Sequence, residues 1–367
     1  MKGNILALTN SIGGLHSFRK EVMMAIIDSG YELYISAPDD DERIKYFEEI
    51  GCKTIKTDFD RRGMNPLADF KLMLKYRQLI KQLKPIAVLS YTIKPNIYGG
   101  IACRLNGTLQ IANVTGLGDA IENGGWLQKL ATSLYRFGIG NAFQVFFQNE
   151  TNRDFCIKCG IADEKSIVLP GSGVNLTYHS YQDYPADGII KFLFIARLLK
   201  DKGTEEYFET AKTIKAKYPQ TEFQIVGYVE GDYQKQLNEL VQDGIINYLG
   251  LTSDIRPFLT GVHCTIMPSY HEGMSNVNLE SAANGRPVIT TNVPGCRETI
   301  EDGRTGFLVQ VRSSSSLTEG VKRFIALSYD DKVKMGLEAR KFVERKFDRQ
   351  IVVDAYLNAI NETQKQP

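Results

Sequence analysis

The stretch from Pro268 to Val288 constrains the fold most, because it joins two apolar runs through a loop and a short helix. The runs GVHCTIMP and RPVITT have strand character, and apolar residues at helical spacing lie between them. Gly285 stands where a helix would end, since glycine readily takes the left-handed backbone of a helix end. Strand, loop, helix and strand in this order predict a doubly wound α/β unit. The apolar helical positions are Val277, Leu279, Ala282 and Ala283.

Two acids, Glu272 and Glu280, lie in this unit with seven residues between them. Loop amides and a helix N-terminus form a ready anion site, and acids beside it need hydroxyls or cations as partners. A nucleotide sugar supplies a diphosphate for the amides and ribose and hexose hydroxyls for the carboxylates. The alternative is a plain capped helix with solvent-facing acids, and spacing alone does not separate the two.

The whole chain has an ordinary globular composition. Its 367 residues suggest two domains, since single cores stop growing near about 250–300 residues. A formal net charge of +1 gives no reason to expect nucleic acid as a partner. No apolar run approaches the ~20 residues of a membrane span. The start, MKGNILALTN, lacks the features of a secretory signal and is expected to form a first strand, so we expect no secretion.

Two short motifs are of types that bind metals in other proteins, but their sequence context argues against metal binding here. Cys156 and Cys159 form a C-x-x-C, but a zinc ribbon needs a second pair, so packing on one helix face is the expected role. Asp58-Phe59-Asp60 is a D-x-D sequence after a short strand, which we interpret as a solvated turn. We therefore expect no metal and no other cofactor.

Two further strand ends carry groups suited to phosphate. The first strand, NILALTN, leads through Gly13 and Gly14 into a helix, which is the phosphate-binding start of a doubly wound domain. Later, IIKFLFIARLLKDKG places Arg197 and Lys202 between a strand and a helix start. Two cations there concentrate positive potential where a diphosphate would lie.

From Arg61 to Arg136 the chain is basic, with eleven Lys or Arg against three Asp or Glu. Two helical segments in this region carry apolar stripes, and a basic surface with apolar edges suits an anionic membrane. Core faces with solvated lysines are the alternative that periodicity leaves open. The apolar positions are Phe70, Leu74, Leu79 and Leu83, then Trp126, Leu130, Leu134 and Phe137.

Several blocks of the second half resemble glycosyltransferase family 4, within the retaining GT-B glycosyltransferases. These are E-G-M-S-N-V-N-L-E, S-A-A-N-G-R-P-V-I-T-T, P-G-C-R-E-T-I and D-G-R-T-G-F-L-V, in the family's order and spacing. In the first half, S-Y-T-I-K-P-N-I-Y-G and IANVTGLG resemble the subgroup that extends undecaprenyl-diphosphate-linked sugars in capsule, O-antigen or protein-glycan assembly. Many members carry a histidine near Thr115, and this chain does not.

The resemblance implies two Rossmann-like domains facing across a cleft. Residues 1–170, joined by a final helix at about 346–367, would form the acceptor-side domain, and residues 171–345 the nucleotide-sugar domain. Arg197 and Lys202 would stabilise the leaving diphosphate and Glu272 would contact the sugar. The other implied donor contacts are Gly13, Gly14, Gly250, Leu251, Gly273, Met274, Ser275, Asn276 and Glu280. The implied acceptor contacts are Tyr91, Thr92, Lys94, Asn96 and Thr115.

The expected reaction transfers a hexose or N-acetylhexosamine from a UDP-sugar to a lipid-linked saccharide, with retention of configuration. The expected location is the cytoplasmic face of the cell membrane. Two alternatives remain at this point: a non-hydrolysing nucleotide-sugar epimerase that needs no acceptor, and a non-catalytic nucleotide-sugar sensor. Sugar identity and linkage position depend on pocket contacts that a sequence does not display.

Overall fold

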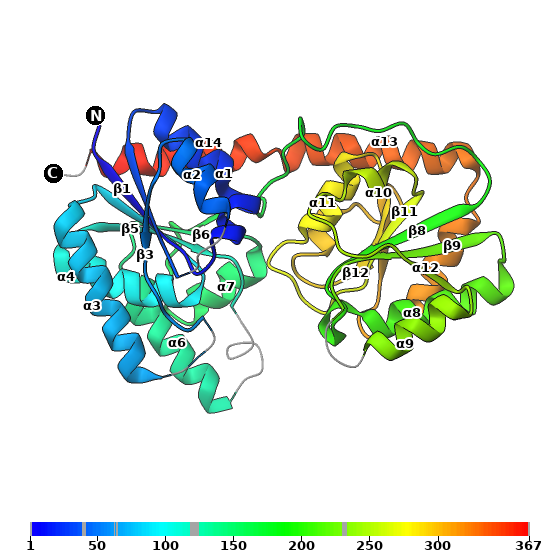
Figure 1. Cartoon of the computed structure of the whole chain (residues 1–367), viewed down its shortest axis with the longest axis horizontal. Coiled ribbons are helices and arrows are strands. Elements are labelled where there is room, and N and C mark those ends of the chain that lie inside the picture. Colours follow the sequence, from blue (N-terminus) through cyan, green and yellow to red (C-terminus); the bar gives the residue numbers. More distant parts are fainter. Residues whose placement is uncertain are drawn as a thin grey trace. The chain divides into compact units, whose positions relative to one another are not determined.

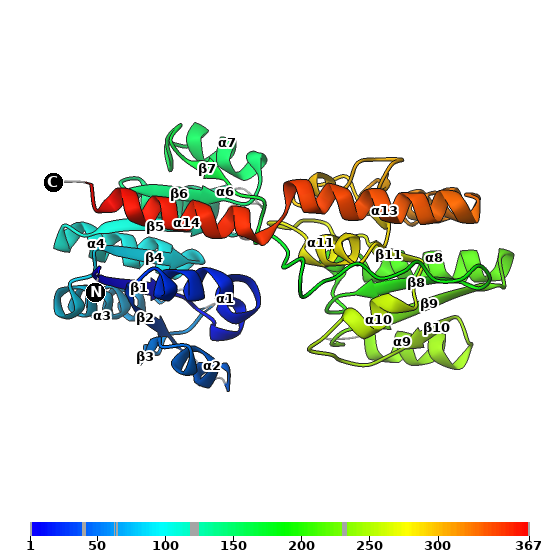
Figure 2. The same cartoon turned by 90° about the horizontal axis from the view of Figure 1, so that it is seen from above.

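The computed structural model describes residues 2–38, 42–61, 63, 65–117, 125–229 and 233–365, without the side chains of residues 126 and 127. It divides the chain into two compact units, one formed by Met1–Ser172 with Arg349–Pro367 and the other by Gly173–Asp348. The sequence placed these boundaries after residues 170 and 345, within a few residues of the observed positions. Each unit is a parallel sheet with helices on both faces (Figures 1 and 2).

The first unit contains a seven-stranded parallel sheet in the order β3-β2-β1-β4-β5-β6-β7. Because β4 lies on the other side of β1 from β2, the chain reverses its direction of sheet growth between β1 and β4. The strands are β1 (Asn4–Leu8), β2 (Glu32–Ala37), β3 (Lys53–Lys56), β4 (Ala87–Tyr91), β5 (Leu109–Val114), β6 (Gln144–Phe147) and β7 (Ile167–Val168). The helices are α1 (Ile12–Asp28), α2 (Arg43–Glu49), α3 (Pro66–Leu83), a π-helix (Pro95–Gly99), α4 (Gly100–Asn106), α6 (Gly125–Ile139), α7 (Glu150–Lys158) and α14 (Arg349–Thr363).

The core of this unit lies on both faces of the sheet, as expected where helices cover each side. Along β1, Ile5 and Ala7 belong to a cluster that includes residues of α1 and α14, whereas Leu6 and Leu8 belong to a cluster that includes residues of α3 and α4. This alternation follows from the two-residue period of a strand. Ser11 caps α1 by accepting a hydrogen bond from the amide of Gly14.

Helix α3 has two apolar faces, which corrects the single face that the sequence suggested. Leu72, Met73, Tyr76 and Ile80 are buried. Phe70 and Leu74 instead project outward, with 55% and 42% of their surface exposed, whereas Leu79 and Leu83 pack partly against the core. Both sets are apolar, so composition alone did not reveal which one faces the sheet.

The second unit contains a six-stranded parallel sheet in the order β10-β9-β8-β11-β12-β13. Its direction of growth reverses between β8 and β11. The strands are β8 (Ile190–Ile195), β9 (Thr221–Val226), β10 (Ile246–Tyr248), β11 (Cys264–Met267), β12 (Val288–Thr291) and β13 (Gly306–Val309). The helices are a 3₁₀ turn (Lys200–Lys202), α8 (Thr204–Lys217), α9 (Tyr233–Gln242), α10 (Arg256–Thr260), α11 (Asn276–Ala283), a 3₁₀ turn (Arg297–Thr299), α12 (Ser314–Ile325) and α13 (Tyr329–Lys346).

The expected strand–loop–helix–strand unit around Glu272 is present as β11, a loop, α11 and β12. Ser275 caps α11, and Gly285 follows its end with a φ of +75°. None of the helices in the described ranges is both long enough and apolar enough to cross a bilayer.

Candidate functional site

The predicted catalytic residues of the second unit come from neighbouring strands at the point where the sheet reverses. Arg197 and Lys202 follow β8, and Glu272 follows β11, which pairs with β8 in parallel. The carboxyl ends of parallel strands at a reversal point are where ligands bind in open α/β sheets. The topology therefore gathers these residues at one edge of the sheet.

Lys202 and Glu272 form an ion pair, with 2.7 Å between Nζ and Oε1. The two side chains are 17% and 18% exposed, so solvent reaches both of them. The hydroxyl of Ser269 donates to the same Glu272 oxygen at 2.9 Å. A lysine and a glutamate predicted from motifs 70 residues apart are thus in direct contact.

The loop carrying Glu272 is fastened to the loop carrying Lys202 by bonds that the sequence did not reveal. The amide of Tyr270 donates to the carbonyl of Asp201 at 2.8 Å. The phenol of Tyr270 donates to Oε1 of Glu206 at 2.8 Å, in the first turn of α8. Glu206 is only 7% exposed. Tyr270 lies in the sequence block P-S-Y-H-E, but only the structure shows that its partner is Glu206 on α8.

Burial raises the pKa of Tyr270, and the hydrogen bond to Glu206 and the charges of Glu206 and Glu205 raise it further, whereas the charge of Arg312 lowers it. The phenol therefore stays protonated and remains a donor near neutral pH. The guanidinium of Arg312 lies 4.9 Å from the centre of the Tyr270 ring, where a cation–π contact is favourable.

Two glycines allow the loops around the ion pair to approach closely. Gly203 has a φ of +74°, and a Cβ there would clash with the carbonyl of Pro268. Gly295 has a φ of +80°, and a Cβ there would lie 2.8 Å from the carbonyl oxygen of Gly273 and closer still to that of Glu272. Both positions require glycine on two grounds, backbone conformation and space.

The predicted donor residues at the start of α11 divide into three kinds. Met274 is 6% exposed and packs into a core cluster, so its backbone is what remains available to a ligand. Ser275 is 2% exposed and accepts the amide of Asn278 as the helix cap. Asn276 holds a buried Oδ1 that has no hydrogen-bond partner among the described residues.

Glu280 lies on α11 with 21% of its side chain exposed. Nε2 of His179 is 3.9 Å from its Oε1, and Nδ1 of the same imidazole is 3.2 Å from Nδ2 of Asn284. His179 thus lies beside the Glu280 carboxylate. The two residues are 101 positions apart, and the sequence did not suggest this proximity.

The predicted base-pocket residues lie beyond β10. Gly250 has a φ of +83°, and its carbonyl accepts the amide of Gly227 at 2.9 Å. Leu251 is 73% exposed, which leaves an apolar side chain available to a flat ligand such as a base. Arg197, between β8 and the 3₁₀ turn, is exposed as well.

A buried thiol lies behind the ion pair. Cys296 is fully buried, and burial raises the pKa of its thiol to about 12, with Glu272 raising it and Lys202 lowering it. Burial likewise raises the pKa of the Cys156 thiol to about 12. Both groups stay as neutral thiols near pH 7, and no cluster of three potential metal ligands occurs among the described side chains.

In the first unit, Gly13 and Gly14 lie inside the first turn of α1 and not in a loop before it. A Cβ at Gly13 would lie 2.6–2.8 Å from the guanidinium atoms of Arg43, so the missing side chain lets this cation approach the helix start. Their donor role stays a prediction.

The predicted acceptor residues follow β4 and β5. Lys94 pairs with Asp69 at 2.6 Å, and Tyr98 donates to the other oxygen of Asp69. Asn96 is fully buried, where its amide donates to the carbonyl of Asn113. Lys94, predicted as an acceptor contact, therefore already has a countercharge within the unit.

The other three predicted acceptor residues differ in exposure. Tyr91 is buried, whereas Thr92 and Thr115 are partly exposed. Thr92 has a φ of +72°, unusual for a β-branched residue. Contact of all five residues with an acceptor stays a prediction.

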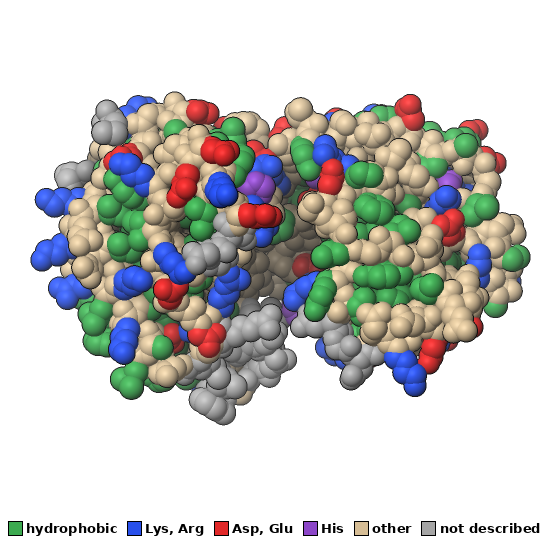
Figure 3. All heavy atoms as spheres, in the orientation of Figure 1, with side chains coloured by type: hydrophobic (Ala, Val, Ile, Leu, Met, Phe, Trp, Pro, Cys, Tyr) green, Lys and Arg blue, Asp and Glu red, His purple; other side chains and the backbone are tan. Residues whose placement is uncertain are grey.

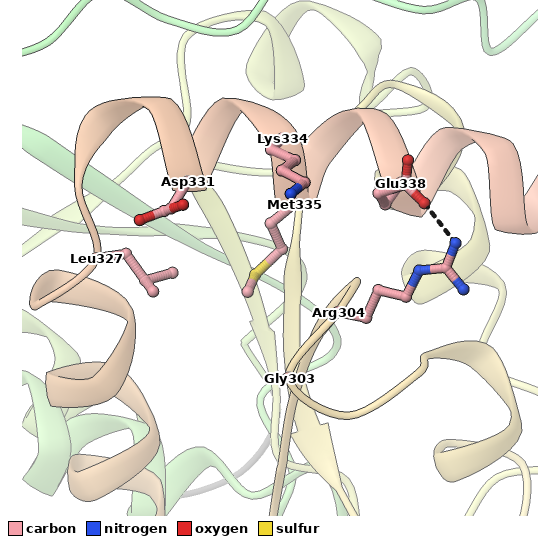
Figure 4. A pocket seen from close by; sticks show the side chains of 7 residues that line it. All are labelled: Gly303, Arg304, Leu327, Asp331, Lys334, Met335 and Glu338. Carbon is pink, nitrogen blue, oxygen red and sulfur yellow. Dashed lines mark hydrogen bonds and ion pairs between the residues drawn. The ribbon is translucent and has the colours of Figure 1, made fainter.

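A separate pocket of about 620 Å³ lies on the second unit and is lined by residues near β13 and on α13 (Figure 4). Arg304 and Glu338 in its wall form an ion pair with 2.7 Å between Nη2 and Oε2. The pocket includes none of the predicted site residues, and two of its charged side chains, Arg304 and Glu338, pair with each other.

Comparison with known proteins identifies the family. A family model described as glycosyl transferase 4-like matches residues 5–149, and one described as glycosyl transferases group 1 matches residues 190–326. The chain is 26% identical to the N,N'-diacetylbacillosaminyl-diphospho-undecaprenol alpha-1,3-N-acetylgalactosaminyltransferase of Campylobacter jejuni, over 95% of this chain and 96% of that protein.

Two further relatives agree. The UDP-Gal:alpha-D-GlcNAc-diphosphoundecaprenol alpha-1,3-galactosyltransferase of Escherichia coli is 25% identical over 74% of this chain and 73% of its own. The crystal structure of Alr3699/HepE from Anabaena, in complex with UDP and glucose, superposes with a TM-score of 0.78 at 19% identity, over 99% of each chain, which shows the shared fold. The predicted family and the predicted pair of Rossmann-like domains are thus confirmed, and this chain belongs to glycosyltransferase family 4, with the GT-B fold.

Proposed function

We propose that this enzyme transfers a hexose or an N-acetylhexosamine from a UDP-sugar to an undecaprenyl-diphosphate-linked saccharide, with retention of anomeric configuration. The observation that carries the proposal is the Lys202–Glu272 pair beside the N-terminus of α11, at the reversal point of the second sheet. The names of the two enzyme relatives support the acceptor class, since both specify a diphospho-undecaprenol sugar and an alpha linkage. UDP-hexoses carry their sugar as the α anomer, so an α product means retention.

The chemistry centres on the leaving phosphate. As the bond between the sugar and the diphosphate breaks, negative charge develops on the phosphate oxygen, and preorganised positive groups stabilise it. Lys202 and Arg197 are the cations at this strand end, and the loop amides before α11 add donors. Lys202 exchanges part of its contact with Glu272 for phosphate when the donor binds.

The carboxylates take the hydroxyls of the donor. Glu272, released in part by Lys202, accepts hydroxyl hydrogens of the transferred sugar, and Glu280 accepts from the ribose. The acceptor hydroxyl attacks on the face that the phosphate leaves, and the departing phosphate oxygen receives its proton. This route accounts for a site in which no side chain was identified as a general base.

The decisive experiment is a panel of UDP-glucose, UDP-galactose and their N-acetyl forms, each with undecaprenyl-diphosphate-linked monosaccharides. We expect one donor to give an elongated lipid-linked product whose new bond is α, as read by NMR coupling. Epimerised donor without acceptor would establish the epimerase alternative, and binding without any turnover would establish the sensor.

Metal independence is part of the proposal, because two cations already face the diphosphate. Activity should survive excess EDTA. A loss that manganese restores and that Asp58→Ala abolishes would show instead that the D-x-D sequence binds a metal. Asp58 is exposed, 3.9 Å from Lys56.

We further propose that the first unit docks on an anionic membrane through α3, α4 and α6. Leu67, Phe70 and Leu74 form an outward stripe on α3, with Leu67 75% exposed. Lysines 71, 75 and 81 are exposed on the same helix. Figure 3 shows basic and hydrophobic side chains intermixed over this part of the first unit.

Helix α6 continues the same surface. Leu130 and Phe137 are 50% and 57% exposed, and Arg104 of α4 lies 4.7 Å over the Phe137 ring. Asn106 of α4 donates to the carbonyl of Arg77 on α3, so the three helices are linked. The predicted stripe on α6 also included Trp126, whose side chain lies outside the described residues. Basic residues near an anionic surface contribute attraction of about 1 kcal/mol each, and exposed apolar residues add shallow insertion.

Liposome cosedimentation tests the docking. We expect binding to anionic vesicles at low salt, release at high salt, and weaker binding after joint substitution of Lys71, Lys75 and Lys81 by Glu. Joint substitution of Leu67, Phe70 and Leu74 by Ser should weaken the part of the binding that salt does not remove. A wild-type protein that ignores anionic vesicles at every ionic strength would exclude the membrane surface and favour a soluble acceptor.

A further inference from the structure

Buried polar groups with unpartnered atoms gather in the first unit around Tyr356 of α14. Arg19 of α1 is 3% exposed, Tyr91 at the end of β4 is 4% exposed, and Asn113 of β5 is fully buried. Four of their atoms have no hydrogen-bond partner among the described residues: Nε and Nη2 of Arg19, the hydroxyl of Tyr91 and Oδ1 of Asn113.

Tyr356 connects these groups. Its ring centre lies 6.0 Å from the guanidinium carbon of Arg19 and 6.2 Å from the ring centre of Tyr91, which stacks on it. Its hydroxyl accepts the amide of Asn113 at 2.9 Å. Burial raises the pKa of Tyr91 well above its ordinary value, the neighbouring Tyr356 raises it further, and the charge of Arg19 opposes the rise.

Arg19 differs from two other cations of the same unit, the buried Arg349 and the partly buried Lys94. Arg349 has Glu21 at 2.8 Å, and Lys94 has Asp69 at 2.6 Å. With the described residues Arg19 makes a single hydrogen bond, from Nη1 to the carbonyl of Phe18 at 2.8 Å. A buried cation that lacks a countercharge is costly, because its lost hydration is not replaced. An anionic ligand would supply what the fold does not.

The position of the group agrees with a ligand site. Tyr91 ends β4 and Asn113 is the last residue but one of β5, and β4 pairs with β1 at the reversal point of the sheet. Thr92, directly after Tyr91, holds a φ of +72° and a buried, unpartnered Oγ1. A π-helix follows at Pro95–Gly99. Left-handed backbone at a β-branched residue and π-helical turns both concentrate at functional sites.

We propose that Arg19, Tyr91 and Asn113 form the anion subsite of the acceptor, and that it takes a phosphate of the sugar–diphosphate–lipid. The proposal rests on the proposed function for the identity of the anion. The guanidinium donates through Nε and Nη2 to two phosphate oxygens, a geometry suited to arginine. The Tyr91 hydroxyl donates to the same group, and Asn113 Oδ1 accepts from a neighbouring hydroxyl or amide. The strained turn at Thr92 is the segment that moves to admit the phosphate.

Substitution of Tyr91 by Phe tests this while keeping the buried ring that stacks on that of Tyr356. We expect an unchanged Tm and an acceptor KM raised about 2- to 10-fold, as for loss of one hydrogen bond, with donor KM unchanged. Tyr76→Phe is the matched control. Tyr76 on α3 is fully buried and its hydroxyl is also unpartnered among the described residues, but it lies in the cluster on the other face of the sheet.

Arg19→Met gives the larger effect. Replacing a buried, uncompensated cation by an apolar chain of similar length should leave Tm unchanged or higher, while acceptor KM rises about 10- to 100-fold. Arg349→Met, which removes the ion-pair partner of Glu21, should instead lower Tm. Acceptor KM values that stay at the wild-type level in both Tyr91→Phe and Arg19→Met would overturn the subsite.

Binding of inorganic pyrophosphate separates the subsite from the reaction. With the donor site saturated by UDP, pyrophosphate should raise the Tm of the wild type and of Tyr76→Phe, but not that of Arg19→Met. Equal protection of all three would overturn the subsite. Arg19-dependent protection in an enzyme that transfers sugar to no lipid-linked acceptor would support the anion subsite and refute the proposed function.

Discussion

In the second unit Lys202 lies against Glu272 and the buried Arg286 donates to backbone carbonyls, whereas in the first unit two nitrogens of the buried Arg19 bond to no described residue. Arg286 is fully buried, and its guanidinium reaches the carbonyls of Leu259, Gln182, Asp183 and Thr260, among others. The second unit therefore satisfies these two cations with its own atoms.

Paired and unpaired cations correspond to two ways in which a protein can be prepared to bind a charged substrate. A pair such as Lys202–Glu272 is ordered before the donor binds and needs only a partial exchange of partners, so little reorganisation accompanies the reaction. A group such as Arg19 and Tyr91 stores an unfavourable energy that a ligand can relieve, at the expense of stability in the free enzyme. Variants of the first kind should lose rate, and variants of the second kind should lose affinity.

The largest effect is expected at the donor-side cations. Lys202→Ala and Arg197→Ala should each lower kcat about 10²–10³-fold, as removal of a preorganised charge donor does, with a smaller change in donor KM. Lys200→Ala is the control, since Lys200 lies in the same 3₁₀ turn and is exposed. Steady-state kinetics that show near-normal turnover in the two site variants would remove their assigned roles.

A smaller loss of rate is expected when the hydrogen bond between Tyr270 and Glu206, which holds the Glu272 loop against α8, is removed. Tyr270→Phe leaves the buried Glu206 without its donor, and loss of a hydrogen bond to a charged group costs about 1.5–3 kcal/mol. We expect kcat to fall about tenfold while acceptor KM stays constant. Tyr233→Phe removes a similar bond, from phenol to Glu205 at 3.1 Å, on an exposed surface and should change neither. Equal kinetics in the two variants would show that the Tyr270–Glu206 hydrogen bond does not affect the rate.

The sequence predicted the donor side more completely than the acceptor side, for a physical reason. Glu272, the cap at Ser275 and Glu280 lie within one strand–helix–strand unit that periodicity predicted, but spacing alone left a plain capped helix open, and the resemblance to the family supplied their expected roles. Lys202 was predicted as a phosphate-facing cation because it lies between a strand and the start of the next helix. The partners that hold these residues, such as Glu206, come from other elements and left no local pattern.

The proposed anion subsite is assembled from distant segments, so the sequence suggested only Tyr91 among its members. Arg19, Tyr91, Asn113 and Tyr356 lie on four different elements, and burial of Arg19 contradicts the usual exposure of arginine. Phe70 and Leu74 project outward on α3 whereas Leu79 and Leu83 pack partly against the core, a division that periodicity did not reveal because both faces of that helix are apolar. Local periodicity gives the existence of an element, but its orientation depends on contacts with the rest of the chain.

The strain at Thr92 offers a test on the scale of about 1 kcal/mol. Thr92→Gly relieves a left-handed backbone that costs a β-branched residue about 1–3 kcal/mol, against about 0.5–1 kcal/mol for the extra freedom of unfolded glycine. We expect a free energy of unfolding about 1 kcal/mol higher and a weaker affinity for acceptor. Lys84→Gly, at the end of α3 with a φ of +45°, should stabilise without affecting affinity. Denaturant unfolding and acceptor titration check both, and a destabilised Thr92→Gly would mean that the turn is not strained.

The smallest expected effect is on the pH dependence of stability, at His263 of the second unit, where both ring nitrogens are hydrogen-bonded. His263 is 4% exposed, its Nδ1 accepts the amide of Lys191 at 3.2 Å, and its Nε2 donates to the carbonyl of Ala186 at 3.1 Å. Burial lowers the pKa of this imidazole below its ordinary value of 6.5, although the bond to Ala186 opposes the shift. Protonation would also destroy the acceptor at Nδ1, so the folded protein resists a proton that the unfolded chain takes up.

The sign of the pH dependence follows from that lowered pKa. Because the unfolded state binds more protons than the folded state below about pH 6.5, the stability that neutral His263 provides is full above this pH and is lost as the pH falls. His263→Gln cannot titrate, so its deficit in Tm relative to wild type should be largest near neutral pH and should shrink under acid conditions. A deficit for His263→Gln that grows as the pH falls would mean that this histidine gains a proton on folding, which its two backbone partners do not permit.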